Sequence, residues 1–571
     1  MTPAPGVAAA PQTGATLPDP PRITTRAVVA GAGLSIFLCA MNSYLTLSFG
    51  VIEEGPTIAA LFFFAFFFLS KTAITTTEMV IVSTMGSAGG SLGFISNFYA
   101  AKAMTGESYT LLEMTGFSIV TSLLGMLFVI PLRELLILKA NLPWPGSKAV
   151  HAVITALVAG GDRKQPLHLL VSVVLLFIWV VGNNDGGFGW FPEGVELPFF
   201  GLAAYGAGVS FSPFATGGSY LMGMRTCVGF LLGGVTLLVM APHLPDPSAP
   251  HRYVWPGIGF LLSSGLTLMV LNWRVLKEAM VSLVSLRPPE EGEDAILRAR
   301  GLGIMAAVAL TVTGLFSVFV MGLSFPVVLV LIVLGGFVQN VIATRAAAQT
   351  AFNPARVMGV LLQGVCAALG ARSAPENLAG AGFVAGSGAQ AGVLTGDLVY
   401  GRWLKVPARW QYWTQMITII PCSLVSAFVF LRIHERTPLM LDGGQLPAPV
   451  AKIWAASAIL FEGRTQMPPM ALESGALAAV LAIFYVLAEE KTPLGKWLPS
   501  STGLGIGLVL PVSYDFSFFL GGFVMWIVLA RWLKVRDITL TTVAVSCIVA
   551  EGLGGVTKPI LQLLGIIGPP G

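Results

Sequence analysis

The chain has 571 residues, of which 55% are hydrophobic and only 11% are charged, and its mean hydropathy is +0.80. Soluble domains carry charge on roughly a quarter of their residues. The composition therefore excludes an ordinary soluble protein and predicts an all-α, polytopic membrane protein with about 14 to 16 candidate spans. The net charge of +4 is small and the basic residues lie in short loops, which predicts no binding to nucleic acid.

Residues 1–25 begin with a stretch rich in Pro and Ala, which predicts a disordered cytoplasmic tail and not a cleaved signal. Arg22 and Arg26 precede the first span, which runs from about Ala27 to Phe49. By the positive-inside rule they place the N-terminus on the cytoplasmic side. We therefore expect a multi-pass protein of the cell inner (cytoplasmic) membrane.

The stretch Thr75–Phe94 is unusually rich in small residues. It starts with an acid, Glu78, and continues with hydroxyl and glycine positions at Ser83, Gly86, Ser87, Gly89, Gly90 and Ser91. A segment this small and polar cannot face lipid, so it is expected to be buried among other spans or to line a cavity. We predict that these six positions contact the substrate.

A span from about Gly116 to Leu138 carries Arg133 near its end, where we expect it to anchor the helix. Pro143 and Pro145 then flank Trp144 and exclude regular helix at that point. The longest charged run, residues 287–300, predicts a solvated cytoplasmic linker. It would separate an N-terminal transmembrane repeat, 26–286, from a C-terminal one, 301–571.

Three landmarks of the first half recur in the same order in the second. The matched pairs are Glu78 with Glu376 (376 − 78 = 298), Leu142–Pro145 with Leu446–Pro449 (446 − 142 = 304), and Leu232–Gly234 with Leu520–Gly522 (520 − 232 = 288). Offsets near 300 indicate an internal duplication. Repeats with interrupted segments at matching positions are typical of secondary transporters, and those segments point to the substrate site.

The counterpart of the first small-residue stretch is Pro375–Arg409. Its glycines have small-xxx-small spacing, which lets helices approach closely. We predict substrate contacts at Gly386, Ser387, Gly388, Gln390 and Tyr400. The basic loop that follows supplies Lys405 and Arg409, which we expect to be structural, as we do for Arg133, Pro143 and Pro145.

A carboxylate within a span is costly to bury, and it can bind a proton on one side of the membrane and release it on the other. We predict proton coupling by Glu78, Glu376, Asp397 and Glu551. The alternatives are that Glu78 and Glu376 cap helix N-termini, and that Asp397 pairs with Arg402 or Lys405. Asp397 follows Glu376 by 397 − 376 = 21 residues, which a straight helix would turn into about 30 Å.

The sequence lacks the motifs of other chemistries. It has no HExxH, GxSxG or Walker A motif, its five histidines are dispersed, and its five cysteines stand singly without a CxxC pair. We expect no metal site, no cofactor and no enzymatic activity. A channel would need a ring of filter residues from an oligomer, which two unequal repeats do not favour.

Several segments carry a family resemblance: Ser87–Phe94, Ile130–Ala149, Ser387–Arg409, Leu504–Gly522 and Ala550–Val556. In order along nearly the whole chain they resemble the oligopeptide transporter (OPT) superfamily, as a bacterial member related to peptide carriers and to yellow stripe-like carriers of metal chelates. The resemblance implies a proton-coupled carrier of about 16 spans in two related halves. It also implies small peptides, peptide-like compounds or metal chelates as substrates.

We therefore predict a symporter that imports a peptide-like solute or a metal chelate by alternating access. The expected partners are this small-molecule substrate, protons and the lipid bilayer, and a homodimer is one oligomeric state to consider. An exporter of a siderophore or metabolite is the alternative within transport. From another class, the alternative is an integral membrane enzyme or a channel-like scaffold.

Overall fold

The computed structural model describes residues 22–49, 55–69, 74–107, 109–140, 142–158, 164–184, 187–197, 203, 205–240, 243, 255–271, 273, 277, 295–350, 353–371, 373–436, 439, 448–463, 470–563 and 565–566. Three sequence predictions fall wholly or partly outside the described residues. They concern the tail up to residue 21, residues 287–294 of the charged linker, and the Leu446–Pro447 part of one repeat landmark.

The described part of the first half is helical apart from one pair of short strands. Its elements are α1 (Thr25–Phe49), α2 (Gly55–Leu69), α3 (Thr76–Leu92), η1 (Gly93–Ile95), α4 (Ser96–Met104), α5 (Leu111–Leu132), η2 (Arg133–Lys139), α6 (Pro145–Val158), α7 (Lys164–Gly182), β1 (Gly194–Glu196), β2 (Gly208–Ser210), α8 (Pro213–Met222), α9 (Met224–Met240) and α10 (Trp255–Leu271). The two strands are antiparallel, with Gly194 opposite Ser210.

The described part of the second half is entirely helical. Its elements are α12 (Ala299–Phe319), α13 (Phe325–Val330), η6 (Leu331–Val338), α14 (Gln339–Thr350), α15 (Ala355–Ala368), α16 (Ala374–Phe383), η7 (Val384–Gly388), α17 (Ala389–Trp403), α18 (Ala408–Arg436), α19 (Pro449–Phe461), α20 (Ala471–Lys491), η8 (Pro493–Lys496), α21 (Ser501–Gly507), α22 (Val512–Gly522), η9 (Phe523–Trp532) and α23 (Asp537–Leu563).

Many of these helices have the length and composition of membrane spans. Eight helical runs among the described residues are long and apolar enough to cross a bilayer, and six further apolar helices are shorter. The prediction of an all-α, polytopic membrane protein is confirmed. Trp144 has a left-handed backbone, with φ of 46°, and α6 starts at the next residue, Pro145. The predicted break in regular helix at this point is therefore confirmed as well.

Both small-residue stretches form long helices with a local irregularity. The first runs from Thr76 to Met104 through the 3₁₀ turn η1, and the second runs from Ala374 to Trp403 through the π-helical segment η7. Because the second run continues through its glycines, Glu376 and Asp397 lie at different levels along one rod. Only one of these two acids can therefore lie at a site in the middle of the membrane.

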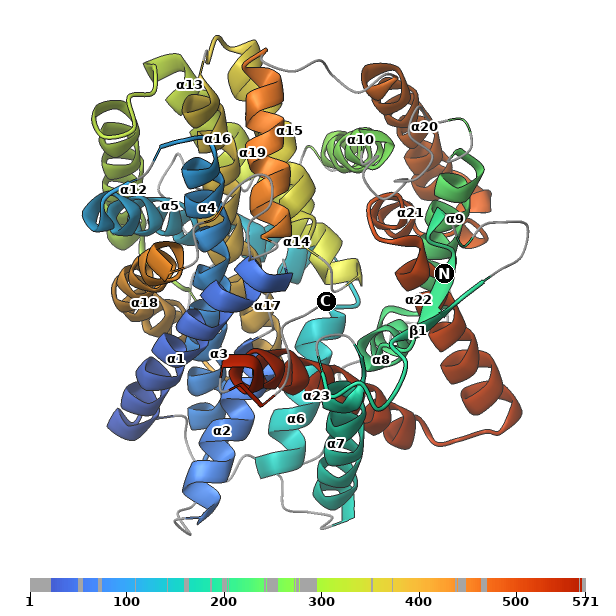
Figure 1. Cartoon of the computed structure of the whole chain (residues 1–571). Helices are drawn as coiled ribbons and strands as arrows, with labels where there is room; N and C mark the ends of the chain where they lie inside the picture. The colour runs from blue at the N-terminus through green and yellow to red at the C-terminus, as the bar shows by residue number, and fades with distance from the viewer. Residues whose placement is uncertain are drawn as a thin grey trace.

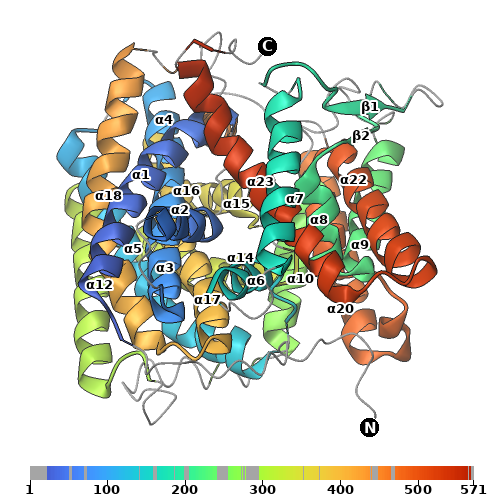
Figure 2. The ribbon, with the colours of Figure 1, turned by 90° about the horizontal axis from the view of Figure 1, so that it is seen from below.

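The helices gather into two bundles (Figure 1). The first contains α1–α5, α12, α13 and α15–α19, and the second contains α7–α9 and α20–α23, so each takes helices from both halves of the chain. Helices α6, α10 and α14 lie where the bundles meet. The view from below shows the same division, with α23 running obliquely between the groups (Figure 2).

Matching positions of the two halves make matching contacts. The backbone N–H of Trp144 donates to the carbonyl of Ala348 at 2.8 Å, and that of Ala448 donates to Leu47 at 2.8 Å. The donors are 448 − 144 = 304 residues apart and the acceptors 348 − 47 = 301 residues apart. Ala448 repeats the left-handed backbone of Trp144, with φ of 39°. Each half thus docks the start of a short helix on the end of a long helix from the other half.

Candidate functional site

Eight polar side chains meet where α3 packs against α17 and α18, and we call this group the central seam. Its members are Thr84, Ser87 and Ser91 on α3, Gln390, Asp397 and Tyr400 on α17, and Gln411 and Gln415 on α18. Each is at most 3% exposed. On α3 the spacing of three and four residues puts the three hydroxyls on one helix face. The seam joins the first half of the chain to the second.

Antiparallel pairing connects α3 with α17. The Ser87 hydroxyl donates to Oδ1 of Asp397 at 3.3 Å, and the hydroxyls of Thr84 and Tyr400 lie 3.2 Å apart. One turn further along, Nε2 of Gln390 donates to the Ser91 hydroxyl at 3.1 Å. The sequence prediction named four of these six residues in its substrate site and Asp397 in proton coupling, and the structure brings all five together.

Two amides of α18 close the seam from the third side. Nε2 of Gln411 donates to Oγ1 of Thr84 at 2.9 Å and to the carbonyl of Asp397 at 2.8 Å. Nε2 of Gln415 donates to Oε1 of Gln390 at 2.7 Å. Sequence reasoning missed both glutamines because α18 reads as an ordinary apolar span. Their spacing of four residues was the available signal.

The predicted glycines serve close helix contact. A Cβ atom at Gly89 would lie 2.0 Å from the carbonyl oxygen of Ser35 on α1, and one at Gly386 would lie 1.9 Å from Oγ1 of Thr121 on α5. At Gly86 the neighbour is Cβ of Ala59, and at Gly388 it is Nε2 of Gln339. Gly90 is also buried. These glycines let polar helices pack without voids, and a substrate contact at them stays a prediction.

Ser83 and Ser387 are both buried, but their hydroxyls differ in hydrogen bonding. Ser387 accepts a hydrogen bond at 2.9 Å from Nδ2 of Asn340 on α14, which extends polar contacts beyond the seam. The Ser83 hydroxyl has no hydrogen-bond partner among the described residues. Both residues are 0% exposed in this conformation.

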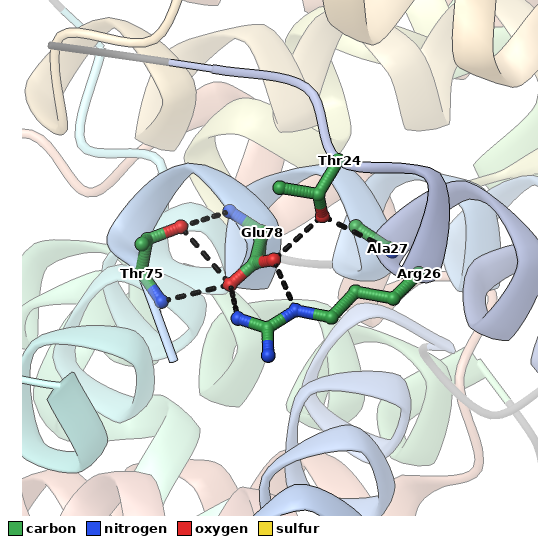
Figure 3. A network of polar contacts seen from close by, with 5 residues as sticks. All are labelled: Thr24, Arg26, Ala27, Thr75 and Glu78. Carbon is green, nitrogen blue, oxygen red and sulfur yellow. Dashed lines mark hydrogen bonds and ion pairs between the residues drawn. The ribbon is translucent and has the colours of Figure 1, made fainter. Parts of the chain in front are cut away.

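Glu78 forms the densest polar network of the predicted site residues (Figure 3). Arg26 contacts its carboxylate with Nε at 2.5 Å and with Nη2 at 2.6 Å, and Thr24 donates a hydroxyl at 2.5 Å. Thr75 donates its backbone N–H at 3.0 Å and completes a capping box at the start of α3. This bidentate ion pair fastens the beginning of α1 to the beginning of α3.

Glu551 and Glu376 lie away from the seam. The Glu551 carboxylate accepts hydrogen bonds from the Ser212 hydroxyl at 2.8 and 2.9 Å and from the backbone N–H of Phe214 at 2.7 Å. It thereby stabilises the N-terminus of α8, where the helix dipole favours negative charge. Glu376 is half-buried in the first turn of α16, and its N–H donates to the Ser373 hydroxyl at 3.4 Å. Coupling roles for both stay predictions.

The residues expected to be structural lie at helix ends. Arg133 begins η2 and is 6% exposed. Pro143 precedes the left-handed Trp144, and Pro145 opens α6. Lys405 turns the chain between α17 and α18 with φ of 56°, and Arg409 lies exposed in the first turn of α18.

Asp515 is an acid that the sequence reasoning missed. It is 0% exposed in the first turn of α22, and neither carboxylate oxygen has a hydrogen-bond partner among the described residues. It faces Gly234 of α9, where a Cβ atom would lie 2.9 Å from Oδ2. The repeat offset of 288 residues aligns Asp515 with Cys227 (515 − 227 = 288), and the signal that could have found Asp515 was an acid directly before the apolar run from Phe516.

No cluster of three or more His, Cys, Asp or Glu side chains that could hold a metal ion occurs among the described residues. The five cysteines are all free and buried. The arrangement offers buried hydroxyls, amides and carboxylates, the last including Glu78, Asp397 and Asp515. These groups can bind a polar solute and protons.

Comparison with known proteins gives a consistent result. Residues 22–251 and 300–561 match the family described as OPT oligopeptide transporter protein. The metal-nicotianamine transporter YSL2 of Arabidopsis thaliana is 24% identical over 517 residues, covering 80% of this chain and 76% of that protein. The probable metal-nicotianamine transporter YSL6 of Oryza sativa is 22% identical, covering 96% and 93%. A putative oligopeptide transporter of Saccharomyces cerevisiae is 27% identical, covering 32% and 26%.

Proposed function

We propose, since the chain belongs to the OPT family of oligopeptide transporters, that it imports a small peptide-like solute or a metal chelate by alternating access coupled to protons. The relatives named for metal-nicotianamine and oligopeptide transport support this substrate range. The chain is a multi-pass membrane protein. We place it in the cell inner membrane with a cytoplasmic N-terminus, because Arg22 and Arg26 precede the first span.

The central seam is the observation that carries the proposal. Buried hydroxyls, amides and a carboxylate are expensive within spans and commonly mark a substrate or ion pathway. Here they lie between a helix of the first half and two helices of the second, Ser87 and Asp397 being one direct contact. A relative movement of these helices would open the seam, and the freed polar groups could then bind a solute.

Alternating access further requires two related units that can rock against each other. The reciprocal hydrogen bonds of Trp144 and Ala448, and the N-caps Thr75 and Ser373 at matching positions, support two related repeats. We assign the repeats to residues 26–286 and 301–571, with the charged stretch 287–300 as the linker. Because each bundle takes helices from both repeats, the two bundles are the units that move against each other.

We assign proton coupling to the buried carboxylates of Asp397 and Asp515. Asp397 accepts a hydrogen bond from the Ser87 hydroxyl inside the seam, and Asp515 has no hydrogen-bond partner among the described residues. Glu78 is a weaker candidate because Arg26 binds both of its oxygens. A carboxylate in this kind of surrounding holds a proton more easily than one in a tight ion pair.

Uptake by proteoliposomes tests the proposed function. We expect the purified protein to accumulate trialanine or Fe(II)–nicotianamine at least about tenfold above protein-free liposomes when the outside is acidic, because an inward proton gradient drives import. A protonophore should abolish the stimulation. If neither solute enters with or without the gradient, the carrier hypothesis fails. Equal uptake at all gradients would remove proton coupling alone.

A further inference from the structure

A small cavity lies at the junction of the two bundles, beside α14. It is lined by η2, α10, α14 and α21 and has a volume of about 30 Å³. Its polar lining consists of Arg345 on α14, Ser264 on α10 and Thr502 on α21, and its walls include Leu261, Leu268 and Ile342. Figure 1 shows α14 facing α10 and α21 across this junction. Helices of both halves of the chain therefore contribute to the cavity.

Arg345 has few hydrogen-bond acceptors and only a distant counter-charge for a cation in this position. Its side chain is 19% exposed, and its Nε is buried without a hydrogen-bond acceptor among the described residues. The nearest carboxylate is Oε1 of Glu490, which lies 3.9 Å from Nη2 on a side chain that is 43% exposed. A guanidinium offers five donors and is costly to bury without an anion. The weak contact with Glu490 leaves most of that capacity unused.

The space beside Arg345 has the size and chemistry of one carboxylate group. A cavity needs roughly 10–15 Å³ of such volume to hold one water molecule, so this one has room for a carboxylate group but not for a whole peptide or chelate in this conformation. The planar guanidinium fork matches a carboxylate with two parallel hydrogen bonds. The lining hydroxyls of Ser264 and Thr502 are the other polar groups at the cavity. The apolar walls would strengthen such an ion pair by excluding water.

The cavity is also connected through α14 to the Gly-rich run that immediately precedes Gln390 of the central seam. Asn340 on α14 donates to Ser387 in the Gly-rich run at 2.9 Å, and Arg345 lies five residues further along α14. Five residues correspond to about 7.5 Å of helix. On the other side, Gly265 of α10 lies directly against Ile342 of α14, where a Cβ atom would come within 2.8 Å. A solute in the seam could thus reach Arg345 once α10 and α14 move apart.

We propose that Arg345 is the anion-binding residue of the transport pathway and that it binds a carboxylate group of the transported solute. This inference rests on the proposed function, and it narrows the substrate class to solutes with an accessible carboxylate. The C-terminus of a peptide and the carboxylates of nicotianamine both meet that requirement. Binding in the junction between the bundles would also link solute occupancy to the movement of one bundle against the other.

A structural role for Arg345 is the competing explanation. In that case the ion pair with Glu490 would hold α14 at the junction to α20 of the second bundle, and loss of either partner should have the same effect. The carboxylate hypothesis predicts different effects, because Glu490 is not part of the solute contact. Arg432 is a suitable control, since it is exposed and pairs with Glu435 at 2.7 Å within one helix.

The test measures uptake kinetics in proteoliposomes for the wild type and for Arg345→Gln, Arg345→Lys, Glu490→Gln and Arg432→Gln, with trialanine and Fe(II)–nicotianamine as probes. We expect Arg345→Gln to raise KM at least about tenfold for the transported probe, because the charge and the fork are both lost. Arg345→Lys should be intermediate. Glu490→Gln and Arg432→Gln should stay within about twofold of the wild type.

Where trialanine is a substrate, a second comparison uses the wild type alone and does not depend on the folding of a variant. If trialanine is transported, trialaninamide should have at least about tenfold higher KM, and if only the chelate is transported, the KM of Arg345→Lys decides. An unchanged KM in both Arg345 variants, equal effects of Arg345→Gln and Glu490→Gln, or equal uptake of acid and amide would overturn the inference. In each of these results wild-type uptake persists, whereas failure of the proposed function would abolish it.

Discussion

Asp515 and Cys227 occupy matching positions in the two halves of the chain. Gly522 faces Cys227, with a Cβ position 3.0 Å from Sγ, just as Gly234 faces Asp515. The Cys227 thiol donates to the carbonyl of Ser219 at 3.5 Å, whereas the Asp515 oxygens have no described partner. A small, weakly polar side chain is thus enough to fill this position. The carboxylate in the second half therefore calls for a reason other than packing.

The surroundings of Asp515 hold no described cation. The elements packed on α22 include α8, α9, β2 and η9. Their titratable residues are Tyr220, Arg225, Cys227 and Arg531, and Arg531 is exposed and lies 531 − 515 = 16 residues further along the helix. Tyr220 binds Asp537, and Arg225 binds Glu489 at 2.7 Å. The start of α22 favours negative charge by up to about 2 kcal/mol, while burying an unpaired carboxylate costs several kcal/mol. We infer that Asp515 carries a proton in this conformation.

Replacing Asp515 by neutral residues tests this inference. The free energies of unfolding of Asp515→Asn and Asp515→Cys should lie within about 1 kcal/mol of the wild-type value, because a protonated carboxyl is already neutral. Their uptake should lose its stimulation by an acidic exterior. Thermal unfolding in detergent and uptake with and without the gradient measure the two effects. As a contrast, Glu551→Gln should lower the free energy of unfolding by about 1–3 kcal/mol, because it weakens the charge-assisted hydrogen bonds to α8.

Wild-type proton dependence in both Asp515 variants would remove this residue from coupling. Strong destabilisation of Asp515→Asn, comparable to that of Glu551→Gln, would instead indicate a charged and paired carboxylate. The two results are independent, since one is read from uptake and the other from unfolding.

At the scale of single elements, α3 divides its small residues between two faces. Thr84, Ser87 and Ser91 point to the central seam, whereas Gly86 and Gly89 meet α2 and α1 on the opposite side. With 3.6 residues per helical turn, these two sets of residues lie on opposite faces of α3. Grouping serine and glycine together as one substrate-facing set, as the sequence analysis did, hides this division.

Gly89→Ala should therefore disrupt the packing of α1 on α3. The added Cβ would lie 2.0 Å from a backbone oxygen of Ser35, and backbone cannot move aside as a flexible side chain can. We expect a loss of about 1–3 kcal/mol in unfolding free energy, measured by thermal unfolding in detergent. The matched control is Gly33→Ala on α1, which has nothing within 4 Å and should stabilise its helix by up to about 1 kcal/mol. Equal behaviour of the two variants would contradict the close contact.

The sequence predicted the elements better than the site. Hydropathy and the repeat landmarks were sufficient for an all-α membrane protein, and proline spacing located the break at Trp144, because these signals are local. Gln411, Asp515 and Arg345 were missed because none of them belongs to a motif, a repeat landmark or a small-residue stretch. Their roles depend on whether a hydrogen-bond partner lies on a helix hundreds of residues away in the sequence. Gln411, for example, donates to Thr84.

At the scale of the whole molecule, the two halves are interleaved. Each bundle contains helices of both halves (Figure 1), and the seam and the reciprocal bonds of Trp144 and Ala448 cross between halves. The halves are therefore held together by contacts buried in the protein and do not depend on the chain that connects residues 271 and 299. Movement between the bundles then requires both halves to move together.

Cutting the connection between the halves tests this arrangement. A protease site inserted after Gly292, in the charged stretch of the sequence, should allow complete cleavage while both fragments remain bound in mild detergent. Uptake should stay within about twofold of the uncut protein, because a connecting loop contributes mainly the entropy of holding its ends together. Affinity purification through one fragment and uptake by the cut protein are the measurements, and the uncleaved insertion variant is the control. Separation of the fragments would show that the halves are independent units, and intact association without uptake would mean that the connection itself takes part in transport.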